Sequence, residues 1–268
     1  MTISQWQLQG VPATVYYVPD FVSEQEEEFM IRKILGSPRS SWKQLSNRRL
    51  QIWGQCGDLT PSNLLLPKKM PPFLTECPDI INRLRNTGVF EESPHGQPNH
   101  ILLNEYEPGQ GIMPHEDGSA YYPVVATISL ASHAVFHYYR YQSGHGTTDH
   151  SGAISASRGR SIDPNPVLSV LLEPRSLIVT TSSLYTSHLH GIEELEEDSF
   201  TISSQDFTQG QAAVVGSPLL PRIANVDLLQ SASVRRVVEE GGTLRRGTRY
   251  SLTCRDVEKV ANVRMFAM

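Results

Sequence analysis

The sequence contains little cysteine. Its three cysteines in 268 residues, Cys56, Cys77 and Cys254, are scattered, and no two stand at the spacing of a metal-binding pair. An odd number of isolated cysteines is typical neither of a disulfide framework nor of a cysteine-based zinc site. We therefore expect reduced thiols and an intracellular protein, in the nucleus or the cytoplasm.

Long hydrophobic runs are also absent. No stretch approaches the ~20 apolar residues that a helix needs to cross a bilayer. The first six residues lack the basic and apolar segments of a secretory signal. The net charge is only −5, which argues against a protein that coats nucleic acid regardless of sequence. With 39% hydrophobic and 19% charged residues, the chain has a globular composition, and we expect a soluble monomer without membrane contact.

The first 95 residues show mainly helical signals. After an expected strand at 14–18, Ser23 and Glu26 have the spacing of a capping box. An apolar stripe follows, so the pattern predicts a helix over about 24–35. A second amphipathic helix is expected over about 72–86, after two prolines.

Residues 38–70 differ in charge from the rest of the chain, because six basic residues there face a single acid. The basic residues are Arg39, Lys43, Arg48, Arg49, Lys68 and Lys69, and the segment also holds Trp42 and Trp53. Basic side chains can neutralise phosphates, and indole rings can stack on bases. The segment is therefore a candidate nucleic-acid surface. The alternative is that the tryptophans belong to the core and the basic residues to a solvated surface.

From about residue 100 the pattern turns to short strands separated by Pro and Gly turns. The expected strands are 101–106, 124–130, 135–139, 167–172, 177–180 and 249–255. Residues 142–166 have no apolar periodicity and are expected to form a loop, and residues 193–243 are treated as a second insertion. Helices followed by strands predict a single α+β, mainly β domain over 1–268. It would be a double-stranded β-helix, or jelly roll, over 96–268, with N-terminal helices packed against it.

A possible metal site lies at His115-x-Asp117. Side chains two apart on a strand project to the same face, so this imidazole and this carboxylate can reach one ion. A distant histidine would complete the two-His-one-carboxylate triad that is typical of non-haem Fe(II) oxygenases. We prefer His190, which is followed by glycine, over its rival His188. The alternative is a histidine and an aspartate that simply face water at the end of a strand.

The run from Arg249 to Arg255 is the most specific feature. On a strand, Arg249, Ser251, Thr253 and Arg255 share one face, and the Tyr, Leu and Cys between them share the other. Two buried guanidiniums need an anionic partner, and each can grip a carboxylate through two parallel hydrogen bonds. The run therefore suits a ligand with a carboxylate at each end. In the alternative orientation the arginines face water and the apolar residues face the core.

Four motifs follow one another along the chain: Asn104-x-Tyr106, His115-x-Asp117, His190-Gly191-Ile192 and Arg249-x-Ser251-x-Thr253-x-Arg255. Their order resembles the signature of the AlkB family of Fe(II)/2-oxoglutarate dioxygenases. Segments 108–118, 171–177 and 246–249 resemble the AlkB homologue 6 subfamily in particular. Ser251 departs from the family's usual asparagine.

The resemblance implies that His115, Asp117 and His190 bind Fe(II), with 2-oxoglutarate as cosubstrate and dioxygen as oxidant. In the family, 2-oxoglutarate becomes succinate and CO2 while an N-methyl group is hydroxylated and lost as formaldehyde. No catalytic residue is implied beyond the metal site. The residues implied to bind 2-oxoglutarate are Arg249 and Tyr106 at its distal carboxylate, and Arg255, Asn104 and Ser251 at the end that chelates the metal.

The resemblance also implies a methylated nucleic acid as partner, RNA or DNA, single-stranded or with its base flipped out. Residues 1–95 would then include a nucleotide-recognition lid. The candidate substrate residues are Trp42, Lys43, Arg48, Arg49, Trp53, Ser119 and Tyr121. Ser119 stands where repair enzymes of the founding type have an acidic residue that reads the base, so base preference does not transfer. The alternatives are a protein-directed hydroxylase or demethylase of the same fold, and a weakly active nucleic-acid-binding protein.

Overall fold

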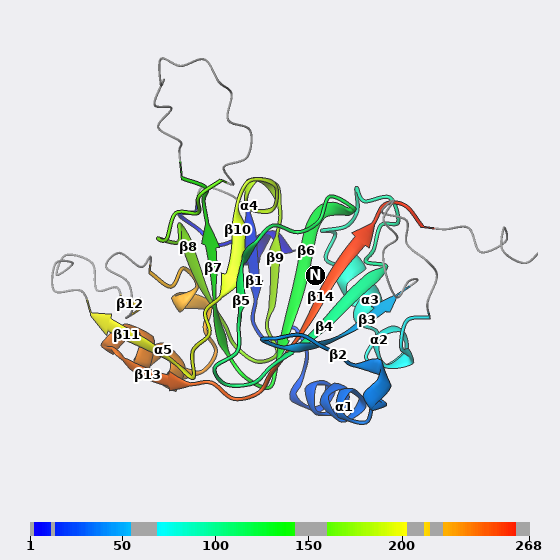
Figure 1. Ribbon diagram of the computed structural model, residues 1–268, viewed down its shortest axis with the longest axis horizontal. Helices are drawn as coiled ribbons and strands as arrows, with labels where there is room; N and C mark the ends of the chain where they lie inside the picture. Colours follow the sequence, from blue (N-terminus) through cyan, green and yellow to red (C-terminus); the bar gives the residue numbers. More distant parts are fainter. Residues whose placement is uncertain are drawn as a thin grey trace, which may run out of the picture.

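The computed structural model describes residues 3–11, 14–54, 69–142, 160–202, 212–214 and 222–260. Two antiparallel sheets form the jelly-roll core, and a third small sheet lies at one end (Figure 1). The large sheet has the order β1-β9-β6-β14-β4-β3-β2, and the small sheet has the order β5-β10-β7-β8. Most of the predicted loop at 142–166 and the positions of Cys56 and Lys68 lie outside the described residues.

The large sheet is centred on β14, which pairs with β6 on one side and β4 on the other (Figure 1). Its strands are β1 (Val15–Val18), β9 (Leu177–Thr180), β6 (Tyr121–Leu130), β14 (Arg249–Val257), β4 (His100–Tyr106), β3 (Arg49–Gly54) and β2 (Lys43–Gln44). Every residue of β14 is buried. A central strand with both faces covered places its alternate side chains in two different environments. Here these are the hydrophobic core and the cavity described below.

The small sheet holds two strands that the sequence pattern did not indicate. Its members are β5 (Ile112–His115), β10 (Leu189–Ile192), β7 (Ala134–Tyr139) and β8 (Leu168–Leu172). Both β5 and β10 are only four residues long, and β5 is an edge strand that contains a proline, Pro114. Short strands with proline show little apolar alternation. The seven strands that were predicted are all confirmed, with ends that shift by at most three residues.

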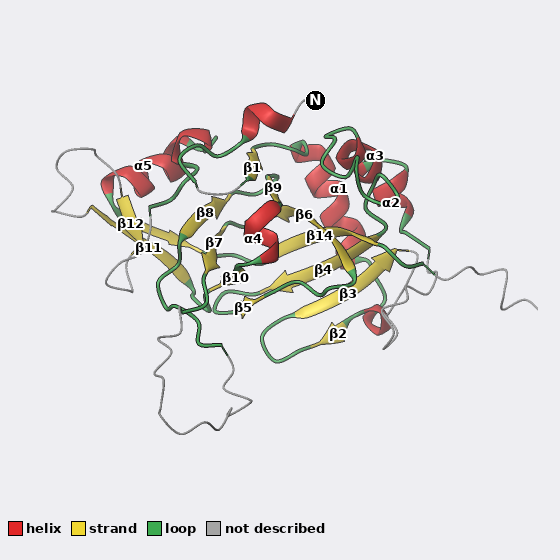
Figure 2. Cartoon of the chain, turned by 90° about the horizontal axis from the view of Figure 1, so that it is seen from above, coloured by secondary structure: helices red, strands yellow, loops and turns green. Residues whose placement is uncertain are grey.

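Three helices cover the face of the large sheet that points away from the small sheet (Figure 2). The first, α1 (Glu24–Leu35), is confirmed together with its capping box: Ser23 Oγ accepts from the amide of Glu26 at 3.3 Å, and the Glu26 carboxylate accepts from the amide of Ser23 at 2.8 Å. Met30 and Ile34 of α1 are fully buried against the sheet.

The prediction of one continuous helix over 72–86 is wrong. The structure has two short helices, α2 (Pro72–Thr75) and α3 (Ile80–Arg85). Pro78 lies between them, and a proline inside a helix lacks the amide donor and clashes with the preceding turn. The apolar periodicity continues across the break because both helices bury their apolar side against the same cluster, with Leu74 and Leu84 fully buried. The expectation of a helical N-terminal part also needs correction, because β2 and β3 extend the large sheet.

The described part of the segment 193–243 is ordered structure, which corrects the expectation of a patternless insertion. It contains β11 (Glu197–Ile202), β12 (Ala212–Val214), the 3-10 helix Val226–Leu228, α5 (Ala232–Glu240) and β13 (Gly242–Arg245). The strands form the small end sheet, on which α5 buries Val238 next to Phe200 and Leu229. Asp198 occupies an inward position of β11, and this buried charge breaks the apolar alternation that would have indicated a strand.

The remaining described helices are short. They are α4 (Ser182–Thr186), which connects β9 to β10, and two 3-10 turns, Ile3–Trp6 and Arg39–Ser41. None of the helices in the described ranges is long and apolar enough to cross a membrane.

The capping box predicts a measurable contribution of Ser23 to stability. Replacing Ser23 by Ala leaves the Glu26 amide without its side-chain acceptor, which costs about 1 kcal/mol. We expect urea denaturation of Ser23→Ala to show this loss with an unchanged m-value. Ser40→Ala, an exposed site beyond the helix, should stay within about 0.5 kcal/mol of the wild type. An equal loss in both variants would contradict the capping role.

Candidate active site

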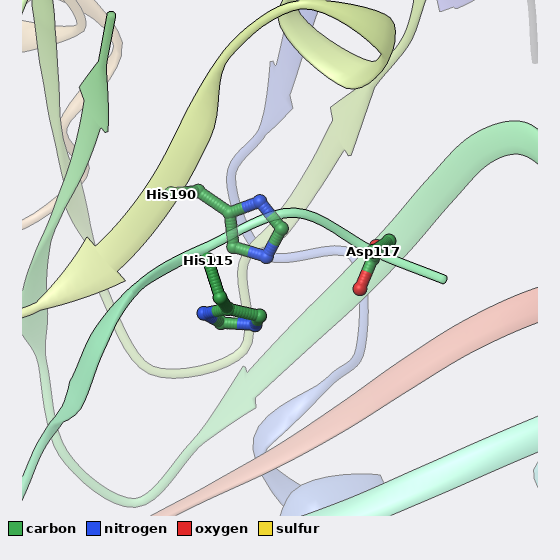
Figure 3. Close-up of side chains that lie close together, drawn as sticks. All are labelled: His115, Asp117 and His190. Atoms are coloured by element: carbon green, nitrogen blue, oxygen red, sulfur yellow. The ribbon is translucent and has the colours of Figure 1, made fainter. Parts of the chain in front are cut away.

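Two histidines face each other across neighbouring strands of the small sheet. His115 of β5 and His190 of β10 are direct partners in the antiparallel register, and their ring centroids are 4.4 Å apart. The ligand atoms of His115, His190 and Asp117 all lie within 4.8 Å of one another (Figure 3). Donors this close can reach a common ion, so the three side chains fit a two-His-one-carboxylate metal site.

The close approach of the two strands depends on Gly191. A Cβ atom at this position would come within 2.9 Å of the carbonyl oxygen of Ile112 and 3.0 Å of the nitrogen of Pro114. Any side chain there would push β5 away from β10. The glycine that follows His190 in the sequence is therefore required by the packing of the two strands that carry the histidines.

Asp117 is held in place by a buried arginine and not by strand geometry. We expected His115 and Asp117 to share one face of a strand, but β5 ends at His115 and Asp117 lies in the following loop. Arg255 of β14 donates Nε and Nη2 to the two carboxylate oxygens of Asp117 at 3.1 and 2.5 Å. Burial opposes ionisation of Asp117, but the charge and hydrogen bonds of Arg255 outweigh it and hold the pKa of this carboxyl below its usual range.

Both imidazoles are neutral, which is the form that binds metals. Burial lowers the pKa of His115, and it lowers that of His190 to about 4. The Nδ1 of His115 lies 2.8 Å from the carbonyl oxygen of Met113, which can only accept a hydrogen bond. The proton therefore sits on Nδ1, and Nε2 is free for a metal. Phe136 stacks on the ring of His190 at 5.4 Å and fixes its plane.

His188, the rival third ligand, is directed elsewhere. It precedes β10, and its Nδ1 lies 2.8 Å from the carbonyl oxygen of Ser183 in α4. It does not belong to the His–Asp–His cluster. The geometry therefore supports the choice of His190.

The three candidate ligands, His115, Asp117 and His190, line a cavity of about 720 Å³ between the two sheets. Arg249, Ser251, Thr253 and Arg255 of β14 all line it, whereas the Tyr, Leu and Cys between them pack into the main hydrophobic cluster. The alternative orientation, with the arginines in water, is wrong. Tyr106 and Asn104 of β4 stand opposite Arg249 and Ser251 in the register and line the same cavity.

Arg249 is a buried cation that forms no ion pair with the described residues. Only 3% of its surface is exposed, and its Nη2 donates to Ser129 Oγ at 2.8 Å. Its Nε has no hydrogen-bond partner, and no carboxylate in the described part of the chain forms an ion pair with it. Burial lowers its pKa to about 10, which still leaves it charged at neutral pH. Such a group is costly unless an anionic ligand completes the site.

The neighbour of Arg249 adds a neutral donor. The guanidinium carbon lies 5.7 Å from the centroid of the Tyr106 ring. Burial raises the pKa of Tyr106, so its phenol remains protonated and can donate a hydrogen bond. An arginine and a phenol that line the same cavity side by side can together donate hydrogen bonds to a carboxylate.

Arg255 and Asn104, both expected at the other carboxylate, already have partners. Arg255 spans Asp117, as described above, and Asn104 Oδ1 accepts from Nε of Arg48 at 3.0 Å. Ser251 lines the cavity between the two arginines of its strand. Its predicted contact with a ligand stays a prediction.

The predicted substrate residues divide into two groups. Arg48, Ser119 and Tyr121 line the cavity. Trp53 does not: only 6% of it is exposed, and it packs edge-on against Phe73 in the core. The idea that its indole is a stacking platform is therefore wrong.

The other three predicted substrate residues, Trp42, Lys43 and Arg49, do not line the cavity either. Trp42 is partly buried against the core, and the guanidinium of Arg49 lies over its ring at 4.2 Å. Arg49 also forms a two-bond ion pair with the buried Glu105. Lys43 is exposed on β2.

Sequence reasoning missed several cavity residues. Val125 and Thr127 of β6 line the cavity. Ser129, two positions after Thr127, does not line it but accepts the hydrogen bond of Arg249. Two polar residues at alternate positions of an otherwise apolar strand, Thr127 and Ser129, were a usable signal. Ser46 and Asn47, in the turn between β2 and β3, also line the cavity. Asn47 donates to Glu194, beyond β10, a contact that the sequence did not signal.

Comparison with known proteins agrees with this geometry. The family model 2OG-FeII_Oxy_2, described as "2OG-Fe(II) oxygenase superfamily", matches residues 14–255. The chain is 34% identical over 264 residues to the "Probable RNA/DNA demethylase ALKBH6" of Danio rerio, which covers 98% of this chain and 94% of that protein. It is 26% identical over 197 residues to the "tRNA (carboxymethyluridine(34)-5-O)-methyltransferase alkbh8" of Xenopus tropicalis, covering 72% of this chain and 27% of that protein. A solved structure, "The structure of OsALKBH1", matches 92% of this chain and 100% of that chain with 14% identity and a TM-score of 0.47. The chain therefore belongs to the 2OG-Fe(II) oxygenase superfamily, as an AlkB-family dioxygenase that resembles ALKBH6 and uses Fe(II), 2-oxoglutarate and dioxygen.

Proposed function

We propose that this dioxygenase is an oxidative demethylase of methylated nucleic acid, RNA or DNA, that takes a base from a single strand or flipped out of a duplex. One observation carries the proposal: a cluster of two neutral imidazoles and one carboxylate opens into the same cavity as a buried guanidinium without an ion-pair partner among the described residues. At about 720 Å³ the cavity falls in the range of ligand sites. The zebrafish relative is named a probable RNA/DNA demethylase, which supports the choice of nucleic acid.

The metal site in this proposal consists of His115, Asp117 and His190. When bound there, Fe(II) supplies dioxygen activation, with 2-oxoglutarate oxidised to succinate and CO2. Met113 orients His115 through its carbonyl group. Arg255 keeps Asp117 ionised and turned toward the histidines. Oriented second partners of this kind tune the affinity of metal ligands.

The cosubstrate site lies along β14. Arg249 and Tyr106 bind the distal carboxylate of 2-oxoglutarate, which supplies the anion that the buried guanidinium lacks. Ser251 and Asn104 lie between Arg249 and Arg255 and face the other end of the diacid. Holding both ends fixes the reacting carbon beside the metal, and this positioning is the main contribution of the protein.

A third arginine remains for the substrate. Within the described cavity wall, Arg255 is neutralised by Asp117 and Arg249 by the diacid, while Arg48 has only the neutral Asn104 as partner. A phosphate of the nucleic acid suits this charge. Ser119 and Tyr121 lie near the metal cluster and face the base. Hydroxylation of its N-methyl group gives a hemiaminal, which releases formaldehyde and returns the proton to nitrogen.

The metal assignment predicts different effects for two histidines. His115→Ala removes one of three ligands and should weaken Mn(II) binding at least ~10-fold in calorimetric titrations, with formaldehyde release lost. His188→Ala, a matched histidine outside the cluster, should bind Mn(II) like the wild type. Equal metal affinity in both variants would exclude this ligand set.

The cosubstrate assignment predicts a strong effect at Arg249. Arg249→Ala should raise the 2-oxoglutarate concentration for half-maximal turnover at least ~30-fold, the equivalent of about 2 kcal/mol, because a buried charge pair is lost. Arg245→Ala removes an arginine whose side chain is 90% exposed and should leave this concentration unchanged. An unchanged requirement in Arg249→Ala would rule out the carboxylate receptor.

The nucleic-acid assignment is tested at Arg48. Arg48→Gln keeps the hydrogen bond to Asn104 but removes the charge. We expect the slope of log affinity against log salt concentration for single-stranded oligonucleotides to fall by about 1. Arg32→Gln removes an equal charge from an exposed site on α1 and should leave the slope unchanged. Identical slopes in wild type and Arg48→Gln would count against a phosphate contact.

The activity itself is tested with a panel of methylated oligonucleotides, single- and double-stranded, assayed for formaldehyde with Fe(II) and 2-oxoglutarate. Release from at least one member supports the proposal. Succinate without formaldehyde across the panel would favour the protein-directed or weakly active alternatives. The monomeric state, the single domain over 1–268 and the location in the nucleus or cytoplasm stay predictions.

A further inference from the structure

Arg246 begins the Arg-Gly-Thr-Arg segment at 246–249, and it has no place in the site described so far. It directly follows β13 and is 8% exposed. Its Nε and Nη2 donate to the two carboxylate oxygens of Asp198 at 2.8 and 2.6 Å. Its Nη1 donates to the carbonyl oxygen of Glu193 at 2.6 Å, and its amide donates to the carbonyl oxygen of Glu196 at 2.8 Å. Every nitrogen of the Arg246 guanidinium therefore has a hydrogen-bond acceptor.

These contacts join the two strands that carry the site. Glu193 follows the end of β10, three positions after His190, and Arg249 stands three positions after Arg246. The connections from β10 to β11 and from β13 to β14 therefore run side by side, and one guanidinium fastens them together. Figure 1 shows both connections where the small end sheet meets the core. β10, which carries His190, and β14, which carries Arg249, belong to different sheets, and no ladder of backbone hydrogen bonds joins these two strands.

Asp198 also shields the cosubstrate receptor from a like charge. Arg246, His133 and Arg249 line a pocket of about 10 Å³, the size of one water molecule, so the two arginines lie close together. The charge of Arg246 contributes to the lowered pKa of Arg249. Asp198 is 1% exposed and forms an ion pair with Arg246, and one of its carboxylate oxygens lies 3.2 Å from Nε2 of His133. Arg246 is thus neutralised locally, and Arg249 remains the cation that an incoming carboxylate meets.

A buried ion pair of this kind adds little net stability, because desolvation offsets most of the attraction, but it can fix geometry. We propose that Arg246 and Asp198 are positioning residues that set the distance between His190 and Arg249, so that a diacid held by Arg249 reaches the metal held by His190. The proposal rests on the functions proposed above for those two residues. It adds a requirement outside the cavity for binding the cosubstrate.

The test uses Arg246→Lys, which keeps the charge but cannot make the three-way set of hydrogen bonds. The measurement is calorimetric titration of 2-oxoglutarate into the full-length protein loaded with Mn(II), without dioxygen or nucleic acid. We expect binding at least ~5-fold weaker than in the wild type, with an unchanged circular dichroism spectrum. Asp198→Asn should weaken binding similarly. The double variant should be no worse than either single variant, because both changes break the same contact.

The matched control is Arg83→Lys. Arg83 makes a similar set of contacts outside the cavity, in a more exposed place: two hydrogen bonds to the carboxylate of Glu26, at 3.0 and 2.5 Å, and one to the carbonyl oxygen of Phe21 at 2.8 Å. Arg83→Lys should leave 2-oxoglutarate affinity unchanged. Wild-type affinity in Arg246→Lys, or an equal loss in Arg83→Lys, would overturn the positioning role.

This outcome is separable from the fate of the proposed function, because the titration requires neither turnover nor substrate. If Arg249→Ala binds 2-oxoglutarate like the wild type in the same titration, the proposed receptor itself is wrong. If Arg249→Ala fails to bind and Arg246→Lys binds normally, only the positioning role falls.

Discussion

The ion pair between Arg255 and Asp117 is the interaction on which the rest of the site depends. Asp117 lies beyond the end of β5, in a loop that no strand ladder fixes. Arg255, from the centre of the other sheet, brings its carboxylate to the histidines and keeps it ionised despite burial. The third metal ligand therefore requires both sheets to be in place, and the site can form only in the assembled fold.

β14 matters both for folding and for the active site, because one of its faces packs in the hydrophobic core and the other lines the cavity. One face buries Tyr250, Leu252 and Cys254 in the main cluster and makes the strand a stable centre of the large sheet. The opposite face presents Arg249 and Arg255 to the cavity. The apolar face stabilises a strand whose other face carries two desolvated charges. Natural proteins accept such local conflicts at functional sites.

The sequence predicted those features of the fold and the site that depend on residues close together along the chain. The capping box of α1, the alternation of β14 and the choice of His190 are of this kind, and each depends on nearby residues. The rest depends on contacts between distant segments. Trp53 looked like a stacking platform but is a core residue, because β3 joins the sheet. Arg49 and Glu105, 56 positions apart, neutralise each other. The end sheet was missed because the charge on its inward face, Asp198, meets Arg246 only in the fold.

Gly191 shows how a residue outside the ligand set can decide whether a metal site forms. Its missing side chain lets β5 and β10 approach until backbone atoms nearly touch. The close contact of the two strands keeps His115 and His190 as direct partners in the antiparallel register. A larger residue at position 191 would therefore damage the metal site without touching it, by moving one imidazole away from the other.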